Sequence, residues 1–294
     1  MSDVTMLPFE RPLALQNSKR MDTYKALYLF DLNNEGHTWV LIFHHGKANE
    51  VGLDVLNELE HLVDELEGNQ SPQTLITLSL RRSRKGKAIF IAGANVTERV
   101  DWDNQRVKIH VRRQRQLLQR LRYAPVFHLC LINGVALGWG TEYLITADYK
   151  LATREAAFAL PETGLGILPG AGGTSELAML IGPAHTLRLG MTGELIDATE
   201  ALRIGLVQEL EDTIELAITR ALSLSILISK KSPTALAAFK RSLLGSLGQD
   251  ATMRSELEAT AYERCVDSGE AAIGRRDFHL IKSGQNPKWG PKKL

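Results

Sequence analysis

The chain has few cysteines and no excess of charge, and both shortages exclude classes of protein. It carries Cys130 and Cys265 among 294 residues, too few for a disulfide scaffold. Cys130 stands in an apolar run and is expected to be a buried small hydrophobe. With 35 basic and 34 acidic residues the net charge is +1, so neither nucleic acid nor a membrane surface is expected as a partner. We therefore expect a protein of the reducing cytoplasm.

Long apolar runs and familiar ligand motifs are also missing. No stretch approaches the roughly 18 apolar residues of a membrane helix, and the N-terminal residues lack the apolar centre of a secretory signal. The histidines lack H-E-x-x-H spacing, so no metal site is expected. The glycine-rich segments break G-x-G-x-x-G at its last position, and neither a P-loop nor a G-x-S-x-G elbow occurs. Any catalysis is left to carboxylates and backbone amides.

The remaining composition, 44% hydrophobic and 23% charged, is that of a globular protein, and its patterning predicts one α/β domain. Residues 1–20, broken by two prolines, are expected to be an N-terminal extension. Residues 21–211 are expected to form the core with the active site, and 212–294 a helical region of the same fold. Apolar patterns predict strands over 24–32, 38–43, 74–80, 88–94 and 126–132, with helices over 51–67 and 101–123 and then through the final third.

Two basic segments stand out from this pattern. The loop 81–87 holds five cations in seven residues and is either a solvated loop or an anion contact. The helix expected over 101–123 has an apolar stripe that includes Val107 and Val111, and its arginines are expected to face solvent.

The most informative stretch runs over residues 133–174, where two glycine clusters each accompany one carboxylate. Gly138-Trp139-Gly140 follows a buried strand and precedes Glu142, whereas Glu162 precedes a second glycine-rich run. Amide groups at such strand ends can stabilise a carbonyl oxygen that gains negative charge. Glu142 could instead simply complement a helix N-terminus, and Glu162 could be an exposed loop carboxylate. If both act, the pattern indicates carbonyl activation with proton transfer.

At these residues the chain resembles the enoyl-CoA hydratase/isomerase (crotonase) superfamily, and most closely an enoyl-CoA hydratase. Four pieces match in order, and with KAN at 47–49 the resemblance covers roughly residues 24–285. The pieces are IAGAN at 91–95, INGVALGWGTEYLITAD at 132–148, FALPETGLGILPGAGGT at 158–174 and GMTGELIDATEALRIGLVQEL at 190–210.

This resemblance implies a crotonase-like spiral of ββα units, with a helical C-terminal region that forms trimers, which often pair into hexamers. It implies an acyl-CoA substrate, with no cofactor beyond the coenzyme A of the substrate, and a lyase of fatty acid metabolism. The reaction would hydrate the C2=C3 bond of a 2-enoyl-CoA thioester to give a 3-hydroxyacyl-CoA.

The same resemblance assigns roles to particular residues. The amides of Ala94 and Trp139 would form the oxyanion hole for the thioester carbonyl. Glu162 would deliver a proton to C2 and Glu142 would help activate the water that adds at C3. The further positions expected to bind substrate are Lys47, Ala92, Gly93, Asn95, Gly138, Gly140 and Gly170.

The chain departs from the family pattern at three places. Trp139 stands where the family usually has glycine or another small residue, so its indole is expected to reshape the acyl pocket. Asn95 replaces a usual aspartate and Thr97 a lysine of some members, so the 81–87 loop or Lys47 would supply a phosphate contact. The C-terminal motif is loosely kept around residues 270–282.

Two alternatives to hydration stay open. One is an enoyl-CoA isomerase, or another crotonase-type lyase acting on a specialised acyl-CoA. Retention of both glutamates favours hydration, because isomerases of the family commonly keep only one. The other is an RNA-binding relative that would use the basic helix and the 81–87 loop, and the near-zero net charge counts against it.

Overall fold

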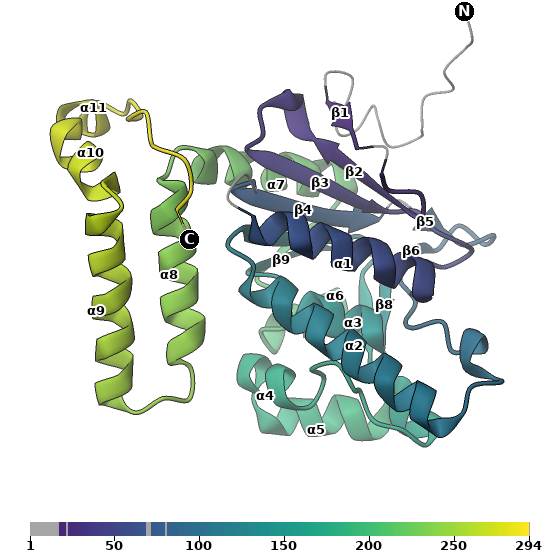
Figure 1. The fold of residues 1–294 in the computed structure, drawn as a ribbon. Coiled ribbons are helices and arrows are strands. Elements are labelled where there is room, and N and C mark those ends of the chain that lie inside the picture. Colours follow the sequence, from purple (N-terminus) through teal and green to yellow (C-terminus); the bar gives the residue numbers. More distant parts are fainter. Residues whose placement is uncertain (1–17, 22, 69–71, 80, 294) are drawn as a thin grey trace, which may run out of the picture.

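The structure is a computed structural model that describes residues 18–21, 23–68, 72–79 and 81–293. Of the extension expected over residues 1–20, only 18–20 fall within this range, and they include strand β1 (Lys19–Arg20). Two sheets and the helices around them make up the described chain (Figure 1).

The larger sheet has seven strands in the order β1-β2-β3-β4-β7-β9-β12. β1, β2 (Leu27–Asp31) and β3 (Thr38–Phe43) are antiparallel, and the strands beyond β3 continue in parallel. Every side chain of β3 and of β4 (Thr74–Ser79) is buried, as the continuous apolar runs predicted. The sheet is completed by β7 (Phe127–Ile132), β9 (Tyr149–Thr153) and β12 (Glu209–Glu211).

The smaller sheet has five strands in the order β11-β10-β8-β6-β5 and positions the site. Its three central strands are β6 (Ala88–Ile91), β8 (Val135–Leu137) and β10 (Ala157–Ala159). They run parallel, so their carboxyl ends meet at one edge of the sheet. The edge strands are β5 (Arg81–Arg82) and β11 (Ile196–Asp197).

Helices α1 (Leu53–Glu67) and α2 (Asn104–Tyr123) lie side by side against the sheets (Figure 1). The expectation that the arginines of α2 face solvent is only half right. Arg113 pairs with Glu60 of α1 at 2.5 Å, and Arg120 pairs with Asp64 and Glu67, each at 2.6 Å. These ion pairs link α2 to α1.

The last third of the chain is helical, as predicted. Helix α7 (Ile214–Ser229) packs on the larger sheet, whereas α8 (Pro233–Ser246) and α9 (Ala251–Asp267) form a hairpin that stands away from the core (Figure 1). The helices after β8 are α3 (Trp139–Leu144), α4 (Ser175–Ile181), α5 (Pro183–Thr192), α6 (Ala198–Arg203), α7 (Ile214–Ser229), α8 (Pro233–Ser246), α9 (Ala251–Asp267), α10 (Glu270–Arg276) and α11 (Phe278–Lys282). In the described ranges no helix is long and apolar enough to cross a membrane.

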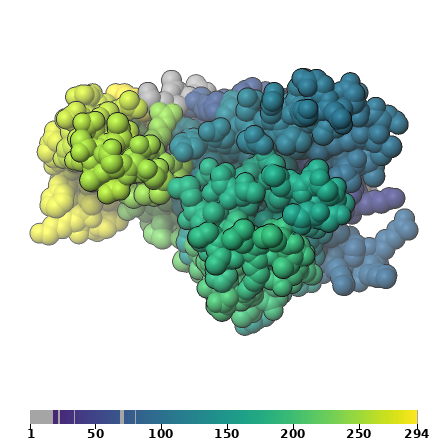
Figure 2. Space-filling view, turned by 90° about the horizontal axis from the view of Figure 1, so that it is seen from below, coloured from purple at the N-terminus to yellow at the C-terminus, as the bar shows by residue number. Residues whose placement is uncertain are grey.

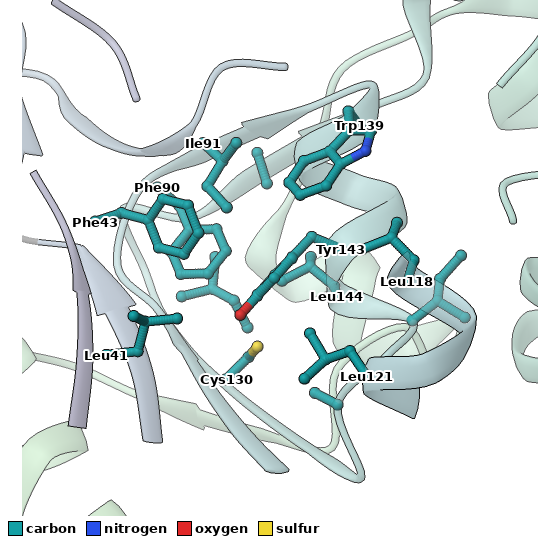
Figure 3. Close-up of a cluster of buried hydrophobic side chains, with 14 of the residues drawn as sticks. Leu41, Phe43, Phe90, Ile91, Leu118, Leu121, Cys130, Trp139, Tyr143 and Leu144 are labelled. Carbon is teal, nitrogen blue, oxygen red and sulfur yellow. The ribbon is translucent and has the colours of Figure 1, made fainter. Parts of the chain in front are cut away.

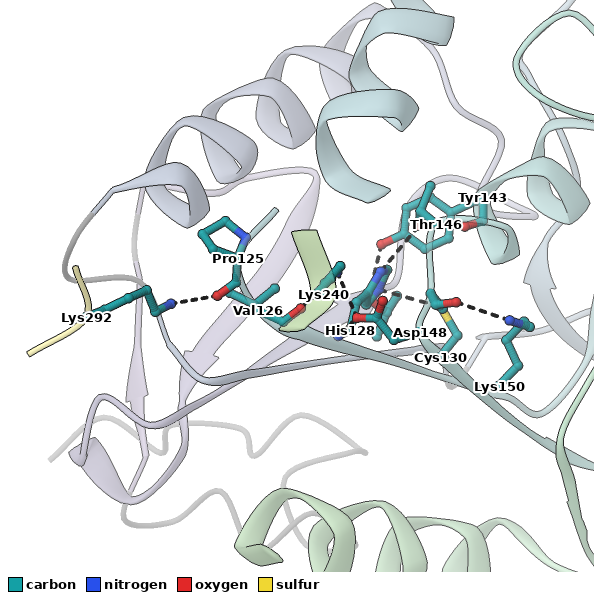
Figure 4. A network of polar contacts seen from close by, with 12 residues as sticks. Pro125, Val126, His128, Cys130, Tyr143, Thr146, Asp148, Lys150, Lys240 and Lys292 are labelled. Atoms are coloured by element: carbon teal, nitrogen blue, oxygen red, sulfur yellow. Dashed lines mark hydrogen bonds and ion pairs between the residues drawn. The ribbon is translucent and has the colours of Figure 1, made fainter. Parts of the chain in front are cut away.

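A buried polar network joins α8 to the core (Figure 4). Lys240 of α8 donates hydrogen bonds to Asp148 Oδ2 at 2.7 Å and to the carbonyl of Val126 at 2.9 Å. Asp148 also accepts the backbone N–H of His128. Burial, and then the nearby charge of Lys240, lower the pKa of His128 to about 3, so its ring is neutral. The network therefore stabilises the contact between α8 and the core. Lys292 connects the C-terminal segment to the same region by donating a hydrogen bond to the carbonyl of Pro125.

Cys130 is fully buried, as expected, and lies in the main hydrophobic core near Tyr143 (Figure 3). The sequence pattern did not predict the short strands after residue 132. Three residues are too few for period-two alternation to be recognised, so β8 and β10 were hidden inside the glycine-rich stretch.

Candidate active site

A cavity of about 610 Å³ opens at the carboxyl ends of β6, β8 and β10. Each strand leads directly into a segment that lines it: residues 92–94 after β6, 138–139 after β8 and 161–162 after β10. Helix α2 closes another side. Figure 2 shows the face on which α2 and the chain around residues 160–190 lie next to each other. Ends of adjacent parallel strands are a common place for a binding site, because backbone groups and loops converge there.

Glu142 lies in the first turn of α3 and is 3% exposed. Its Oε1 accepts the backbone N–H of Ala171 at 2.6 Å and that of Gly173 at 2.9 Å. Burial raises the pKa of Glu142, whereas the two N–H donors and the charge of Arg115 oppose that rise. This carboxylate is therefore held in one orientation by donors that favour its ionised form.

Glu162 lies in the first turn of the 3-10 helix η4 (Pro161–Leu165) and is 8% exposed. Its Oε2 is shielded from solvent and has no hydrogen-bond partner within the described ranges. Burial raises the pKa of Glu162 to about 7, and the charge of Glu142 adds to this effect. Two carboxyl groups whose pKa values are both raised by burial therefore face one cavity, and only Glu142 is held by backbone N–H donors from another segment.

The amides of Ala94 and Trp139 both reach the cavity. Val51 pairs with Gly93 O and with Asn95 N, so the N–H of the intervening Ala94 is directed away from that bridge. Trp139 is the first residue of α3, where a helical N–H has no partner within its helix. Neither N–H is bonded to an acceptor among residues that the structure describes. They are available for a ligand oxygen.

The indole of Trp139 is 3% exposed and packs into the hydrophobic core (Figure 3). Its ring centroid lies 5.6 Å from that of Tyr143, with a tilt of 35°. Trp139 is also among the residues that line the cavity, and its buried Nε1 has no acceptor within the described chain. The structure therefore accommodates this large side chain by burying its indole in the hydrophobic core beside Tyr143.

The structure brings most of the predicted substrate-binding residues to the cavity wall, including Ala92, Gly93, Gly138 and Gly170. Three others lie outside the lining. Lys47 is exposed and its carbonyl accepts a hydrogen bond from Arg81. Asn95 Oδ1 accepts from the Thr97 hydroxyl, and Gly140 packs against the backbone of Ile91. Their part in substrate binding stays a prediction.

Within the basic loop, Arg82 forms an ion pair with Glu155 at 2.7 Å. This pairing occupies one of the five cations that the sequence offered for an anion contact. The contact between the loop and a phosphate stays a prediction.

Sequence reasoning missed the residues that support the site from outside the two glutamate motifs. Ala171 and Gly173 hold Glu142, but amide donors carry no sequence signal of their own. Arg99, Gln114 and Arg115 line the cavity as well. A signal existed for Gln114, because it interrupts the apolar stripe between Val111 and Leu118 of α2.

Comparison with known proteins identifies the family. The family model for enoyl-CoA hydratase/isomerase matches residues 40–284. A short-chain-enoyl-CoA hydratase of Clostridium acetobutylicum is 30% identical over 259 residues, which cover 86% of this chain and 97% of that protein. The chain belongs to the enoyl-CoA hydratase/isomerase family and is an enzyme of that family.

Solved structures agree in fold. An enoyl-CoA hydratase from Bacillus anthracis superposes with a TM-score of 0.78 at 27% identity, covering 93% of this chain and 99% of that one. DspI from Pseudomonas aeruginosa superposes with a TM-score of 0.79 at 30% identity, covering 90% and 97%. The crotonase-like fold expected from the sequence is confirmed.

Proposed function

We propose that the enzyme hydrates the C2=C3 double bond of a 2-enoyl-CoA thioester to a 3-hydroxyacyl-CoA. The observation that carries this proposal is the pair of buried glutamates on one cavity, of which Glu142 is held by two N–H donors and Glu162 has a pKa of about 7. Hydration needs a base that takes a proton from water and an acid that gives a proton to carbon. The environment of Glu142 suits the base, and that of Glu162 suits the acid.

In this mechanism the thioester carbonyl oxygen accepts hydrogen bonds from the backbone N–H groups of Ala94 and Trp139. The charge that develops on its oxygen as the double bond is attacked is stabilised by donors already in place, a contribution typically of about 3–4 kcal/mol per donor. Glu142 accepts a proton from the water that adds at C3, and Glu162 delivers its proton to C2. The chain supplies every proton transfer, so we propose that turnover needs no cofactor beyond the coenzyme A of the substrate.

The RNA-binding alternative finds less support in the arrangement of charges. Arg113 and Arg120 of the basic helix are engaged with carboxylates of α1. A phosphate backbone would have to displace these pairs, so the surface is not an open row of cations.

The experiment that tests the proposal compares two substrates. Purified enzyme is incubated with crotonyl-CoA, and loss of the enoyl absorbance is followed together with formation of 3-hydroxybutyryl-CoA. But-3-enoyl-CoA is assayed in parallel. Rapid hydration of crotonyl-CoA supports the proposal. Conversion of but-3-enoyl-CoA to crotonyl-CoA, with crotonyl-CoA itself left unhydrated, would establish an isomerase.

We also propose that the chain assembles as a homotrimer or as a hexamer of two trimers in the cytoplasm. The support is the apolar surface of the α8–α9 hairpin, where large side chains face outward. Phe239 is 74% exposed and Tyr262 70% exposed, and large apolar side chains gathered on one exposed face are typical of an interaction surface. Light scattering during size-exclusion chromatography measures the mass directly, and a monomer would contradict this assembly.

A further inference from the structure

One part of the cavity lining is polar and cationic, whereas the rest, including Val107 and Val111 of α2, is largely apolar. Arg99, from the 3-10 helix η3 (Thr97–Arg99), and Gln114 and Arg115, from α2, line the polar side. Leu165 and Leu168 line the cavity from the segment that follows Glu162. An apolar enoyl chain needs only the apolar part of the lining, so the polar side requires its own explanation.

Gln114 is the most constrained member of this wall. It is 3% exposed, and its Oε1 lies 3.5 Å from Arg99 Nη2. Its Nε2 has no acceptor anywhere in the described part of the chain. A buried donor without an acceptor costs about 1–3 kcal/mol, and native proteins keep few of them. The side-chain amide of Gln114 therefore has an N–H donor that no acceptor of the described chain satisfies.

No ion pair of Arg99 is found among the described residues, although the charge of the adjacent Glu98 partly offsets the lowering of the Arg99 pKa by burial. The Nε of Arg99 is shielded and lacks an acceptor there as well. The neighbouring Glu98 is engaged by the backbone N–H of Leu53 at 3.1 Å, at the start of α1. Glu50 also lines the cavity, together with Glu142 and Glu162, and is exposed to solvent.

The surroundings carry a positive field. Burial, and then the charges of Arg99, Arg113 and Arg106, together lower the pKa of His110 to about 4. Of these three arginines, Arg113 has its carboxylate in Glu60, and Arg106 stacks on the Trp102 ring at 4.2 Å. Arg99 is the one of the three that forms neither an ion pair nor a ring contact within the described chain, so its guanidinium can take an anionic partner.

We propose that the acyl part of the substrate carries a carboxylate, which Arg99 and Gln114 bind at the α2 wall. This inference rests on the acyl-CoA hydration proposed for the same cavity and names its substrate class, a 2-enoyl-CoA with a second, free acid group. Arg99 supplies the charge for a charge-assisted hydrogen bond, and Gln114 supplies a neutral donor beside it. A carboxylate gives the donors of both side chains the acceptors that they lack.

A phosphate of coenzyme A is the other anion that could reach Arg99. It would come from the solvent-facing side of the cavity, whereas Gln114 is only 3% exposed. The two sources differ in a measurable way. A phosphate contact serves every coenzyme A ester equally, and a carboxylate contact serves only esters that carry the acid.

The test uses pairs of substrates with matched shape. In one pair, 4-carboxybut-2-enoyl-CoA is compared with 5-methylhex-2-enoyl-CoA, in which an isopropyl group replaces the carboxylate. A second pair is one methylene longer. We expect kcat/KM to favour the acid by at least about tenfold in one pair, because a site built to bond a polar group discriminates strongly against its absence.

Variants then locate the preference. Gln114→Leu continues the apolar stripe of α2 and is expected to fold, and Arg99→Gln keeps a polar side chain of similar reach. Each is expected to lower the ratio of kcat/KM for acid over alkyl substrate by about 10- to 100-fold. Arg106→Gln is the matched control. It removes a positive charge from the N-terminal part of α2, at a residue that does not line the cavity. Its ratio should equal that of the wild type.

Two results would overturn the inference. One is no preference for the acid at either chain length. The other is an Arg99→Gln variant whose kcat/KM falls by the same factor on both members of a pair, which assigns Arg99 to coenzyme A.

Binding of glutaryl-CoA and 5-methylhexanoyl-CoA, measured by calorimetry, separates this inference from the proposed reaction because neither saturated ester can be hydrated. Tighter binding of glutaryl-CoA that depends on Gln114 supports the carboxylate site even if hydration fails. Hydration of crotonyl-CoA without any such preference supports the reaction and rejects the site.

Discussion

Gly138 leaves the space in which the carboxylate of Glu162 sits. A Cβ atom placed on Gly138 would lie 2.5 Å from Glu162 Oε1, and the residue has a φ of +52°. Both facts require glycine at this position, the first through close approach and the second through a backbone conformation that other residues rarely adopt. The two glycine-rich motifs of the sequence therefore meet at this contact.

The first prediction follows from this contact. Gly138→Ala should displace the Glu162 carboxyl group and lower kcat for crotonyl-CoA by about 100-fold, since small misplacements of catalytic groups are costly. The control is Gly164→Ala, two residues after Glu162, where an added Cβ meets nothing within 4 Å. If Gly138→Ala turned over as fast as Gly164→Ala, Glu162 would not need its present position.

A second prediction concerns stability and pH. The folded pKa of Glu162, about 7, lies above the ordinary value of 4.5. Between these values the folded state keeps a proton that the unfolded chain has lost, so stability falls as pH rises from about 4.5 to 7. Glu162→Gln removes this penalty and should raise the free energy of unfolding by up to about 3 kcal/mol at pH 8, at about 1.4 kcal/mol per pKa unit.

Urea unfolding of the wild type and of Glu162→Gln at pH 5 and pH 8 measures this effect. The gain should be clearly larger at pH 8. An equal difference at the two pH values would show that Glu162 is not protonated in the folded protein.

The third prediction concerns the joint between α8 and the core. Lys240→Met leaves Asp148 without its cation and should lower the free energy of unfolding by roughly 3 kcal/mol, as expected when one partner of a buried ion pair is removed. Arg276→Ala, which breaks an exposed pair with Asp277, should leave the free energy of unfolding almost unchanged, because solvent screens such a pair. Similar losses in the two variants would contradict a structural role for the buried network.

Much of the framework was predictable because it depends on local patterns. The apolar runs that became β3, β4 and β7 are buried on both faces, and the stripe of α1 faces the core. The two glutamates were assigned catalytic roles through the family motifs. Residue spacing alone left open that Glu142 complements a helix N-terminus and that Glu162 is an exposed loop carboxylate. The α2 wall was not predicted, because Arg99 and Gln114 reach the cavity only after α2 has packed across the strand ends. Its position depends on tertiary structure that no local pattern records.

Trp139 gives a fourth prediction. Trp139→Ala keeps the amide of the oxyanion hole but removes a buried indole, so the free energy of unfolding should fall by about 3–5 kcal/mol. The vacated volume borders the cavity, and the preferred enoyl chain should become longer. Chemical denaturation and a series of enoyl-CoA chain lengths measure the two effects. An unchanged chain-length profile would mean that the indole does not limit the acyl pocket.

The central claim is that Glu142 and Glu162 share the hydration chemistry, and the most direct measurement is the rate of crotonyl-CoA hydration in Glu142→Gln, Glu162→Gln and the double variant. In Glu142→Gln the side-chain amide oxygen can still accept the N–H groups of Ala171 and Gly173, so the fold should persist while the base is lost. We predict that each single variant lowers kcat by about 10²–10⁴-fold, and that the double variant is little worse than the slower single one, because the two groups act as a unit. Turnover at the wild-type rate in both single variants would contradict the account.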